Sequence, residues 1–235
     1  MKIEELNLNP MLLKVVKGMG FIDATPIQEK CIPPIREGKD VVGQSSTGSG
    51  KTAAFGLPIL EKVQPGHGLQ VLILTPTREL CVQVTETMNE FGRHIHTRAV
   101  SVYGGVGIEP QIRSIKAADV VVGTPGRVLD HLERKTIKFD NVKYLVLDEA
   151  DRMFDMGFID DVERIISQVP KDRQTMLFSA TIGADVHNVV RKHLRSPITI
   201  KGEIYVDKSL LKQAYYDIKA YEKFSLLVHL LRNKT

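Results

Sequence analysis

The chain alternates short runs of consecutive apolar residues with longer stretches of helical periodicity, and this alternation restricts its fold most strongly. Most of the apolar runs are apolar throughout rather than at every second position, which is typical of strands buried on both faces. They lie at 40–44, 71–75, 98–104, 118–124, 144–148, 175–181 and 197–202, with helical patterns between them, for example at 50–63, 78–91, 126–134 and 184–194. The sequence therefore predicts an α/β fold, a parallel sheet flanked by helices on both faces.

The bulk composition fits a globular chain without a secretory or membrane segment. The 235 residues, 43% of them hydrophobic, suffice for one domain with a full core plus a smaller piece. Cys31 and Cys81 lie far apart and offer neither a disulfide framework nor metal-ligand spacing, which favours an intracellular, cytoplasmic location. No apolar run reaches the roughly 18 residues of a membrane span, so no membrane is expected. The net charge of +4 permits an anionic partner without requiring one.

The last part of the chain differs from the rest. Residues 203–212 are polar and irregular, as a linker would be, whereas 213–221 reads as one strand and 222–234 as one amphipathic helix. The apolar face of this helix carries Phe224, Leu227, Leu230 and Leu231. A lone strand and helix cannot bury such a face by themselves.

We therefore expect a first domain at 1–202, a linker at 203–212 and, at 213–235, the opening of a second domain. The alternative is a terminal unit that docks back on the first sheet. The exposed face also predicts self-association through residues 213–235.

The stretch QSSTGSGKT, residues 44–52, ends like a phosphate-binding loop and lies between a predicted strand and a predicted helix. Gly48 and Gly50 let the backbone bend so that its amides point at phosphate oxygens, and the following helix adds its positive N-terminal end. Lys51 can reach the β- and γ-phosphates, and the Thr52 hydroxyl can ligate Mg²⁺. The residues expected to hold the nucleotide here are Ser45, Ser46, Thr47, Gly48, Ser49, Gly50, Lys51 and Thr52.

Ser45 departs from the usual form of this loop, which has a glycine at that position. A strict need for glycine would mean a positive φ or no room for a Cβ atom. Serine indicates that neither condition holds and that a small side chain suffices. We expect its hydroxyl to cap the loop or to contact solvent.

A second candidate element follows the apolar run Leu145–Leu147, which leads directly into Asp148 and Glu149. A buried strand that ends in two carboxylates places them at the carboxyl edge of the sheet, where ligands of open α/β folds bind. We expect Asp148 to hold Mg²⁺ through water and Glu149 to orient and deprotonate an attacking water. The alternative for the pair is a helix N-cap with acidic residues in the first turn.

With these two elements in place, the chain resembles the N-terminal, RecA-like half of a DEAD-box RNA helicase, a P-loop NTPase fold, over residues 1–235. Each short motif alone is weak, but seven occur in the family's order. They are ATPIQ (24–28), SSTGSGKT (45–52), PTREL (76–80), Gly104-Gly105, TPGR (124–127), DEAD (148–151) and SAT (179–181). That family usually has alanine at the position of Ser45, so the resemblance implies a phosphate loop that does not need its first glycine.

The resemblance implies that Gln28, with Thr25 nearby, reads the adenine edge and favours ATP, because an amide both donates and accepts. Two departures concern the same region. The family commonly has an aromatic residue at the position of Ile3 and a proline at that of Ala24. An isoleucine can pack on the base but offers no π-face, and Pro26 keeps the turn stiff.

The resemblance also implies a surface that holds single-stranded RNA by its backbone, without sequence preference. Its residues are Pro76, Thr77, Arg78, Gly104, Gly105, Thr124, Pro125, Gly126 and Arg127, which all follow predicted strands. Ser179 and Thr181 would couple the acidic motif to this surface, with Asp151 as a partner.

These implications together predict the first domain of an ATP-dependent RNA helicase, with ATP and Mg²⁺ as cofactors and Lys51, Asp148 and Glu149 as catalytic residues. A second RecA-like domain, absent from this chain, would supply arginine fingers and the rest of the RNA clamp. The alternatives are a nucleotide-gated RNA clamp or scaffold and another RecA-like, DNA-dependent ATPase.

Overall fold

The computed structural model describes residues 1–202 and 214–232, which fall into two compact units, Met1–Ile204 and Tyr205–Thr235. The predicted linker at 203–212 lies outside the described residues. Within those residues, no helix is long and apolar enough to cross a lipid bilayer.

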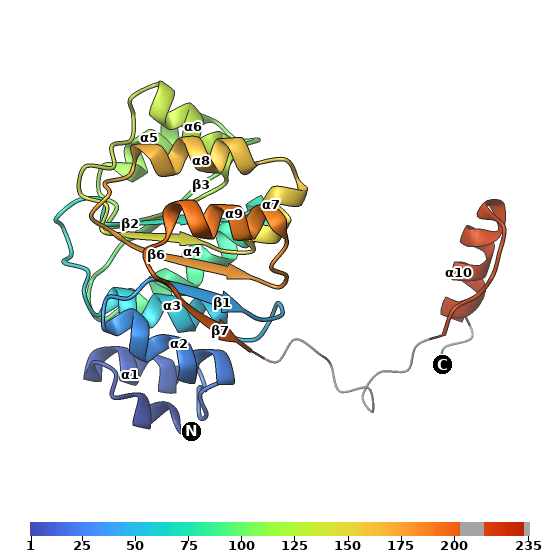
Figure 1. Cartoon of the computed structure of the whole chain (residues 1–235), viewed down its shortest axis with the longest axis horizontal. Coiled ribbons are helices and arrows are strands. Elements are labelled where there is room, and N and C mark those ends of the chain that lie inside the picture. The colour runs from blue at the N-terminus through green and yellow to red at the C-terminus, as the bar shows by residue number, and fades with distance from the viewer. Residues whose placement is uncertain (203–213, 233–235) are drawn as a thin grey trace. The chain divides into compact units, whose positions relative to one another are not determined.

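The first unit is built around a seven-stranded sheet in which every strand pair is parallel (Figure 1). The strands are β1 (Val41–Gln44), β2 (Val71–Leu74), β3 (Ala99–Val102), β4 (Val120–Gly123), β5 (Tyr144–Leu147), β6 (Gln174–Ser179) and β7 (Ile198–Lys201). Their order across the sheet is β3-β4-β2-β5-β6-β1-β7. Each strand coincides with one of the predicted apolar runs, although β6 begins one residue before its run, and the predicted parallel arrangement is confirmed.

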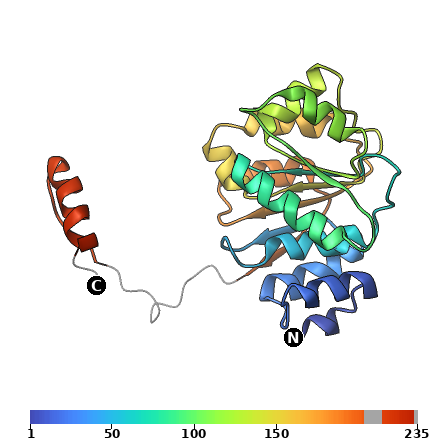
Figure 2. The same cartoon turned by 180° about the vertical axis from the view of Figure 1, so that it is seen from behind.

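Successive residues of the central strands enter two different cores, as the two-residue period of a strand requires. Val71 and Ile73 of β2 pack into one core, and Leu72 and Leu74 into the other. The first core is closed by α1 (Pro10–Gly18), α2 (Pro26–Arg36), α3 (Lys51–Leu60) and α4 (Arg78–Gly92), after a short 3-10 helix at Ile3–Leu6. The second core is closed by α5 (Ile108–Ile115), α6 (Pro125–Glu133), α7 (Ala150–Asp155), α8 (Ile159–Gln168) and α9 (Ala184–His193). Figure 1 looks onto α8 and α9, and Figure 2 shows the opposite face of the sheet.

The two elements on either side of the 45–50 loop, β1 and α3, both pack against β6. A Cβ atom at Gly43 would lie 2.5 Å from the ring of Phe178 on β6, so the two strands meet where only glycine fits. The same ring packs against Phe55 of α3, with ring centroids 5.3 Å apart. Strand β1 and helix α3, which bracket the 45–50 loop, are therefore held to β6 through one buried aromatic ring.

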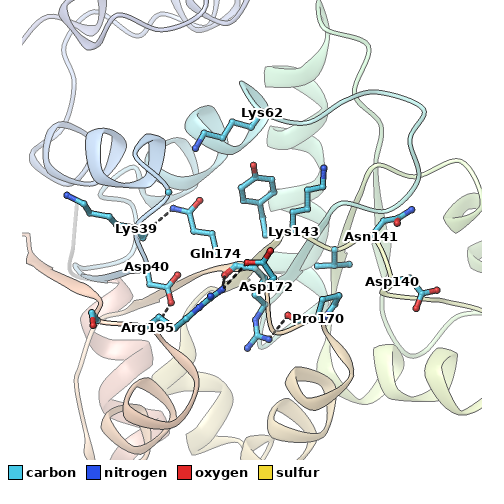
Figure 3. Close-up of a pocket in the computed structure, with 15 residues that line it drawn as sticks. Lys39, Asp40, Lys62, Asp140, Asn141, Lys143, Pro170, Asp172, Gln174 and Arg195 are labelled. Carbon is cyan, nitrogen blue, oxygen red and sulfur yellow. Dashed lines mark hydrogen bonds and ion pairs between the residues drawn. The ribbon is translucent and has the colours of Figure 1, made fainter.

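The amino edge of the sheet is joined by polar contacts around a hollow of about 860 Å³ (Figure 3). The Asp40 carboxylate accepts hydrogen bonds from the backbone amides of Thr175 at 2.8 Å and Arg195 at 2.6 Å. The Gln174 side chain donates to the Ile35 carbonyl at 2.9 Å and the Lys39 carbonyl at 2.6 Å. These bonds connect the starts of β1, β6 and β7, and none of the seven motifs lies at this edge.

In the second unit, residues 214–219 carry no strand, a 3-10 helix spans Ala220–Glu222, and α10 covers Lys223–Arg232. The predicted helix is confirmed, whereas the strand predicted at 213–221 is wrong for its described part. A strand needs a neighbour to pair with, and residues 214–219 have none among the described residues. Phe224, Leu227 and Leu231 are 76%, 52% and 67% exposed, so their own unit leaves the apolar face of α10 uncovered.

Candidate functional site

All the predicted motifs that follow strands meet at the carboxyl edge of the sheet, because the strands are parallel. The loops after β3, β4 and β2 carry the predicted RNA residues and are neighbours on one side of the sheet. The loop after β1 is the phosphate loop, on the other side. Between them lie β5, which leads into Asp148, and β6, which ends at Ser179. The acidic motif is therefore placed between the nucleotide loop and the RNA residues.

The phosphate loop bends through two glycines with positive φ, Gly48 at 80° and Gly50 at 91°, and α3 begins directly after it. The Ser49 hydroxyl donates to the Ser46 carbonyl at 2.8 Å. Lys51 is only 7% exposed, and its Nζ donates to the Ser45 carbonyl at a long 3.4 Å. Within residues 1–202 and 214–232, no ion pair involves this ammonium group. A buried cation with one weak partner suits a phosphate ligand.

Of the two roles expected for the Ser45 hydroxyl, contact with solvent does not occur, because Ser45 is fully buried. Its Oγ shares a hydrogen bond with the Ser49 hydroxyl at 2.9 Å, across the base of the loop. The backbone amide of Ser45 donates to the Ser179 carbonyl, as in a continued strand pairing. Ser45 has no positive φ, which explains why the position does not need glycine.

Gln28 and Thr25 lie against the phosphate loop although they belong to α2 and its start. The Gln28 Oε1 accepts from the backbone amide of Thr25 at 3.0 Å, and its Nε2 donates to the Gly50 carbonyl at 3.2 Å. Gly50 has a φ of 91°, which favours glycine, and a Cβ atom there would lie 2.4 Å from that Nε2 and would displace the Gln28 amide. Thr25 and Gln28 thus form a capping box at the start of α2, which holds both residues beside the phosphate loop.

Ile3, at the position where the family has an aromatic residue, is only 1% exposed. It packs into the first core with Leu6 and Ile27. The expectation that it can pack on the adenine base is therefore wrong for this structure, because its apolar surface is already covered. Ala24 is also buried, and Pro26 is the first residue of α2, where its fixed φ suits a helix start.

Asp148 and Glu149 follow β5, as the sequence predicts, and both are buried. Desolvation raises the pKa of Asp148 to about 6, and the charge of Lys51 acts to lower it, which places these two groups within electrostatic reach of each other. The Glu149 carboxylate accepts a hydrogen bond from the Thr47 hydroxyl of the phosphate loop at 3.1 Å. Glu149 has a φ of 51°, a strained conformation for a residue with a side chain. It precedes α7 but makes no side-chain cap, against the N-cap alternative.

The donor set at this point fits Mg²⁺ rather than a metal held by protein ligands alone. No group of three or more His, Cys, Asp or Glu side chains is placed to hold a metal within the described part of the chain. Mg²⁺ is commonly bound by one or two carboxylates together with phosphate oxygens and water. Two residues suit this arrangement. Asp148 is a buried carboxylate whose charged form a bound cation would stabilise, and Thr52 is the second residue of α3.

Asp151, Ser179 and Thr181 form one hydrogen-bonded group. The Asp151 carboxylate accepts from the backbone amide of Thr181 at 2.8 Å and from its hydroxyl at 2.9 Å. The backbone amide of Asp151 donates to the Ser179 hydroxyl at 3.2 Å, and that hydroxyl donates to the Thr181 carbonyl at 2.7 Å. The structure thus joins the start of α7 to the end of β6, the partnership that the resemblance implies.

The predicted RNA residues lie at or just after the ends of β2, β3 and β4. Thr77 caps α4 by accepting from the Leu80 amide, and Arg78 is exposed with its guanidinium 4.8 Å from the centre of the Tyr103 ring. Gly104 and Gly105 are exposed, whereas Pro76 is buried at the end of its strand. Thr124, Pro125, Gly126 and Arg127 form the start of α6. The Arg127 guanidinium turns toward the glycine loop and donates to the Val106 carbonyl at 3.0 Å.

Sequence reasoning missed Tyr103, whose ring lies under Arg78. An aromatic residue directly before a glycine pair is a usable signal in a chain with no tryptophan and six tyrosines. It also missed Gln111 and His131, two buried polar residues that contact each other across 20 positions of the chain and leave no sequence pattern.

A model of the DEAD/DEAH box helicase family matches residues 25–189. The chain is similar to an ATP-dependent RNA helicase CshA from Limosilactobacillus reuteri, with 47% identity over 98% of this chain and 47% of the relative. A CshA protein from Listeria monocytogenes is 48% identical over 98% of this chain and 45% of its own length. The chain thus spans about half the length of the curated relatives it matches.

Among solved structures, a DEAD box protein from the hyperthermophile Methanococcus jannaschii matches with a TM-score of 0.85 and 42% identity, over 100% of this chain and 64% of that one. This match confirms the RecA-like fold. A hypothetical ATP-dependent RNA helicase from Sulfolobus tokodaii matches with a TM-score of 0.78 and 41% identity, over 83% of this chain and 57% of that one. By its motifs, its fold and the family match over residues 25–189, the chain belongs to the DEAD/DEAH box helicase family.

Proposed function

We propose that the chain is the nucleotide-binding half of an ATP-dependent RNA helicase, which holds ATP with Mg²⁺ at one side of its sheet edge and single-stranded RNA at the other. The relatives named above are ATP-dependent RNA helicases by name. The observation that carries the proposal is the contact between the phosphate loop and the acidic motif. The Thr47 hydroxyl donates a hydrogen bond to the Glu149 carboxylate, and the charge of Lys51 acts to lower the pKa of Asp148.

At the nucleotide, Lys51 and the glycine-bent amides of the loop would bind the phosphates, and Thr52 and Asp148 would hold Mg²⁺. The metal ion, when bound, supplies positive charge that neutralises the phosphate oxygens. Glu149, held by Thr47, would orient the attacking water and accept its proton. Gln28, already bonded to Gly50, would fix the adenine relative to the phosphates.

At the RNA, exposed backbone amides after β3 and at the start of α6, with Arg78, would contact phosphate and sugar rather than bases. The group formed by Asp151, Ser179 and Thr181 would link this surface to the acidic motif. We propose that residues 213–235 open a second RecA-like domain. Self-association through them and a cytoplasmic location remain predictions.

The proposal is tested by nucleotide and RNA binding. A fluorescent ADP analogue should bind the chain in the presence of Mg²⁺, unlabelled ATP should compete better than GTP, and Lys51→Ala should abolish binding without unfolding the chain. Equal competition by GTP, or unchanged binding by Lys51→Ala, would contradict the nucleotide site. A labelled single-stranded RNA that binds no better than DNA of the same sequence would favour the DNA-dependent alternative.

Turnover distinguishes the enzyme from a nucleotide-gated clamp. We expect ATP hydrolysis by this chain to be slow, because a missing arginine finger costs roughly 10³- to 10⁵-fold in related phosphoryl-transfer enzymes. Turnover as fast as that of a two-domain version would contradict this. In the longer protein, Glu149→Gln should keep ATP and RNA binding and abolish turnover. RNA release at the parent rate by that variant would favour the clamp.

A further inference from the structure

A chain of buried polar contacts joins the second core to the three loops of the predicted RNA surface. His131 of α6 is fully buried, and its Nε2 lies 3.2 Å from the Oε1 of Gln111 on α5. Gln111, 7% exposed, donates from its Nε2 to the Tyr103 carbonyl at 3.0 Å, directly before the glycine pair. The Tyr103 ring in turn lies under the Arg78 guanidinium.

The donors and acceptors in this series of contacts fix which atom donates at each step from His131 to the Tyr103 carbonyl. Gln111 donates to a carbonyl with its nitrogen, so the oxygen that faces His131 accepts, and the His131 Nε2 must carry a proton. The Thr136 hydroxyl lies 2.8 Å from the Nδ1 and also donates to the His131 carbonyl at 3.1 Å. Burial and the neighbouring Arg127 lower the pKa of His131, and the Asp130 carboxylate acts in the opposite direction. The contact with Gln111 therefore requires a proton on the Nε2 of His131.

A second contact fixes the same loop from the start of α6. Arg127 donates from one guanidinium nitrogen to the Val106 carbonyl, and its other terminal nitrogen is buried without a partner. The Gly104–Gly105 segment thus lies between two anchored carbonyls, Tyr103 and Val106. Gly105 itself has a φ of 81°, so the backbone between the anchors has a shape that few residues adopt.

We propose that His131 and Gln111 are positioning residues for RNA: through the Tyr103 carbonyl they hold the Gly104–Gly105 backbone in its binding shape and keep the Tyr103 ring under Arg78. Neither residue would touch RNA. Phosphate recognition by backbone amides requires those amides to be fixed before the ligand arrives, since ordering a loose loop on binding costs affinity. This inference rests on the proposed RNA surface and assigns the residues that shape it.

The test compares four variants of this chain: His131→Ala, Gln111→Ala, the double variant, and Leu129→Ala as a matched control. Leu129 is a buried residue of α6 that packs in the second core and makes no polar side-chain contact, so its truncation reports general loosening of the helix. Amide hydrogen exchange at residues 103–107 measures the loop. Fluorescence anisotropy with a labelled oligouridine at low salt measures RNA affinity, and a fluorescent ADP analogue measures the nucleotide site.

We expect His131→Ala and Gln111→Ala each to lower exchange protection of the loop and RNA affinity by about tenfold, the value of one lost buried hydrogen bond of roughly 1.4 kcal/mol. The double variant should lose no more exchange protection or RNA affinity than either single variant, because both substitutions interrupt the same series of contacts. Nucleotide affinity should not change. Gln111→Glu should also loosen the loop, since a carboxylate still accepts from His131 but cannot donate to the Tyr103 carbonyl.

Loop protection that falls equally in Leu129→Ala, or additive losses in the double variant, would overturn the inference. So would full protection of residues 103–107 in His131→Ala. If the parent chain binds no RNA at all, the proposed function fails. In that case, an unchanged loop in the variants would still overturn the positioning role, and a loosened loop would support it.

Discussion

Asp148→Asn should make the protein more stable at neutral pH while it removes the metal ligand. Asp148 is buried, and desolvation raises its pKa from 3.8 to about 6. A shift of about two units corresponds to roughly 3 kcal/mol of differential stability. Because the folded-state pKa is the higher one, the folded state binds the proton more tightly. The resulting penalty is absent below about pH 3.8, grows as the pH rises toward about 6, and is fully present above it.

Asparagine removes this penalty, since it has no charge to bury and its side-chain oxygen can still accept from the Glu149 amide at the 3.0 Å seen for Asp148. Lys51 loses its opposite charge in the variant, which offsets part of the gain. We therefore expect the free energy of unfolding to rise by about 1 to 3 kcal/mol at about pH 7.5. The difference from the parent should shrink below about pH 6 and vanish near pH 4.

Urea unfolding followed by far-UV circular dichroism, repeated from about pH 4 to pH 7.5, measures this difference. Asp172→Asn is the matched control, because the Asp172 side chain is fully exposed and its replacement should leave the pH dependence unchanged. An Asp148→Asn variant less stable than the parent at about pH 7.5, or a gain that does not depend on pH, would refute the reasoning. Binding of the fluorescent ADP analogue should meanwhile lose its Mg²⁺ dependence.

Three further changes test other parts of the site. Gly50→Ala should destabilise the fold by about 1 to 3 kcal/mol and abolish nucleotide binding, because the new Cβ atom would meet Gln28 and the backbone is left-handed there. The control Gly126→Ala in α6 should leave stability unchanged, because a Cβ atom there meets nothing within 4 Å. Thr181→Val removes the hydrogen bond from the Thr181 hydroxyl to Asp151, so the free energy of unfolding should fall by about 0.5 to 1.5 kcal/mol. An unchanged urea midpoint would argue against that bond. Burial raises the pKa of the Cys31 thiol to about 12 and that of Cys81 to about 11, so a thiol reagent at about pH 8 should label both only after unfolding; labelling of the native chain would contradict this.

Much of the fold could be predicted because the strands are continuously apolar, a pattern that reflects burial on both faces of a parallel sheet. The same pattern located the site, since polar and glycine-rich residues that follow such strands must share an edge. Lys51 and Asp148, predicted from two separate motifs, do lie at that edge within electrostatic reach of each other. The predicted roles of these residues remain proposals.

The expectations that the structure did not bear out concern residues whose state depends on how the chain packs around them. Residues 214–219 have an alternation that suits a strand, but a strand forms only where another strand pairs with it. The Ser45 hydroxyl was expected to cap the loop or to contact solvent, and the turn of the loop buries it against Ser49. Ile3 could pack on a base by its residue type, although without a π-face, yet the first core covers it.

The amino-acid sequence by itself determined the strands, the helices between them and the edge at which the motifs gather, because these follow from local periodicity and from the parallel direction of the strands. Only the tertiary structure decided the strand order, which puts β5 and β6 between the phosphate loop and the predicted RNA loops. It also decided contacts such as the one between Thr47 and Glu149, which lie 102 residues apart. Such pairings arise from the packing of whole helices and strands, so no local stretch of sequence encodes them.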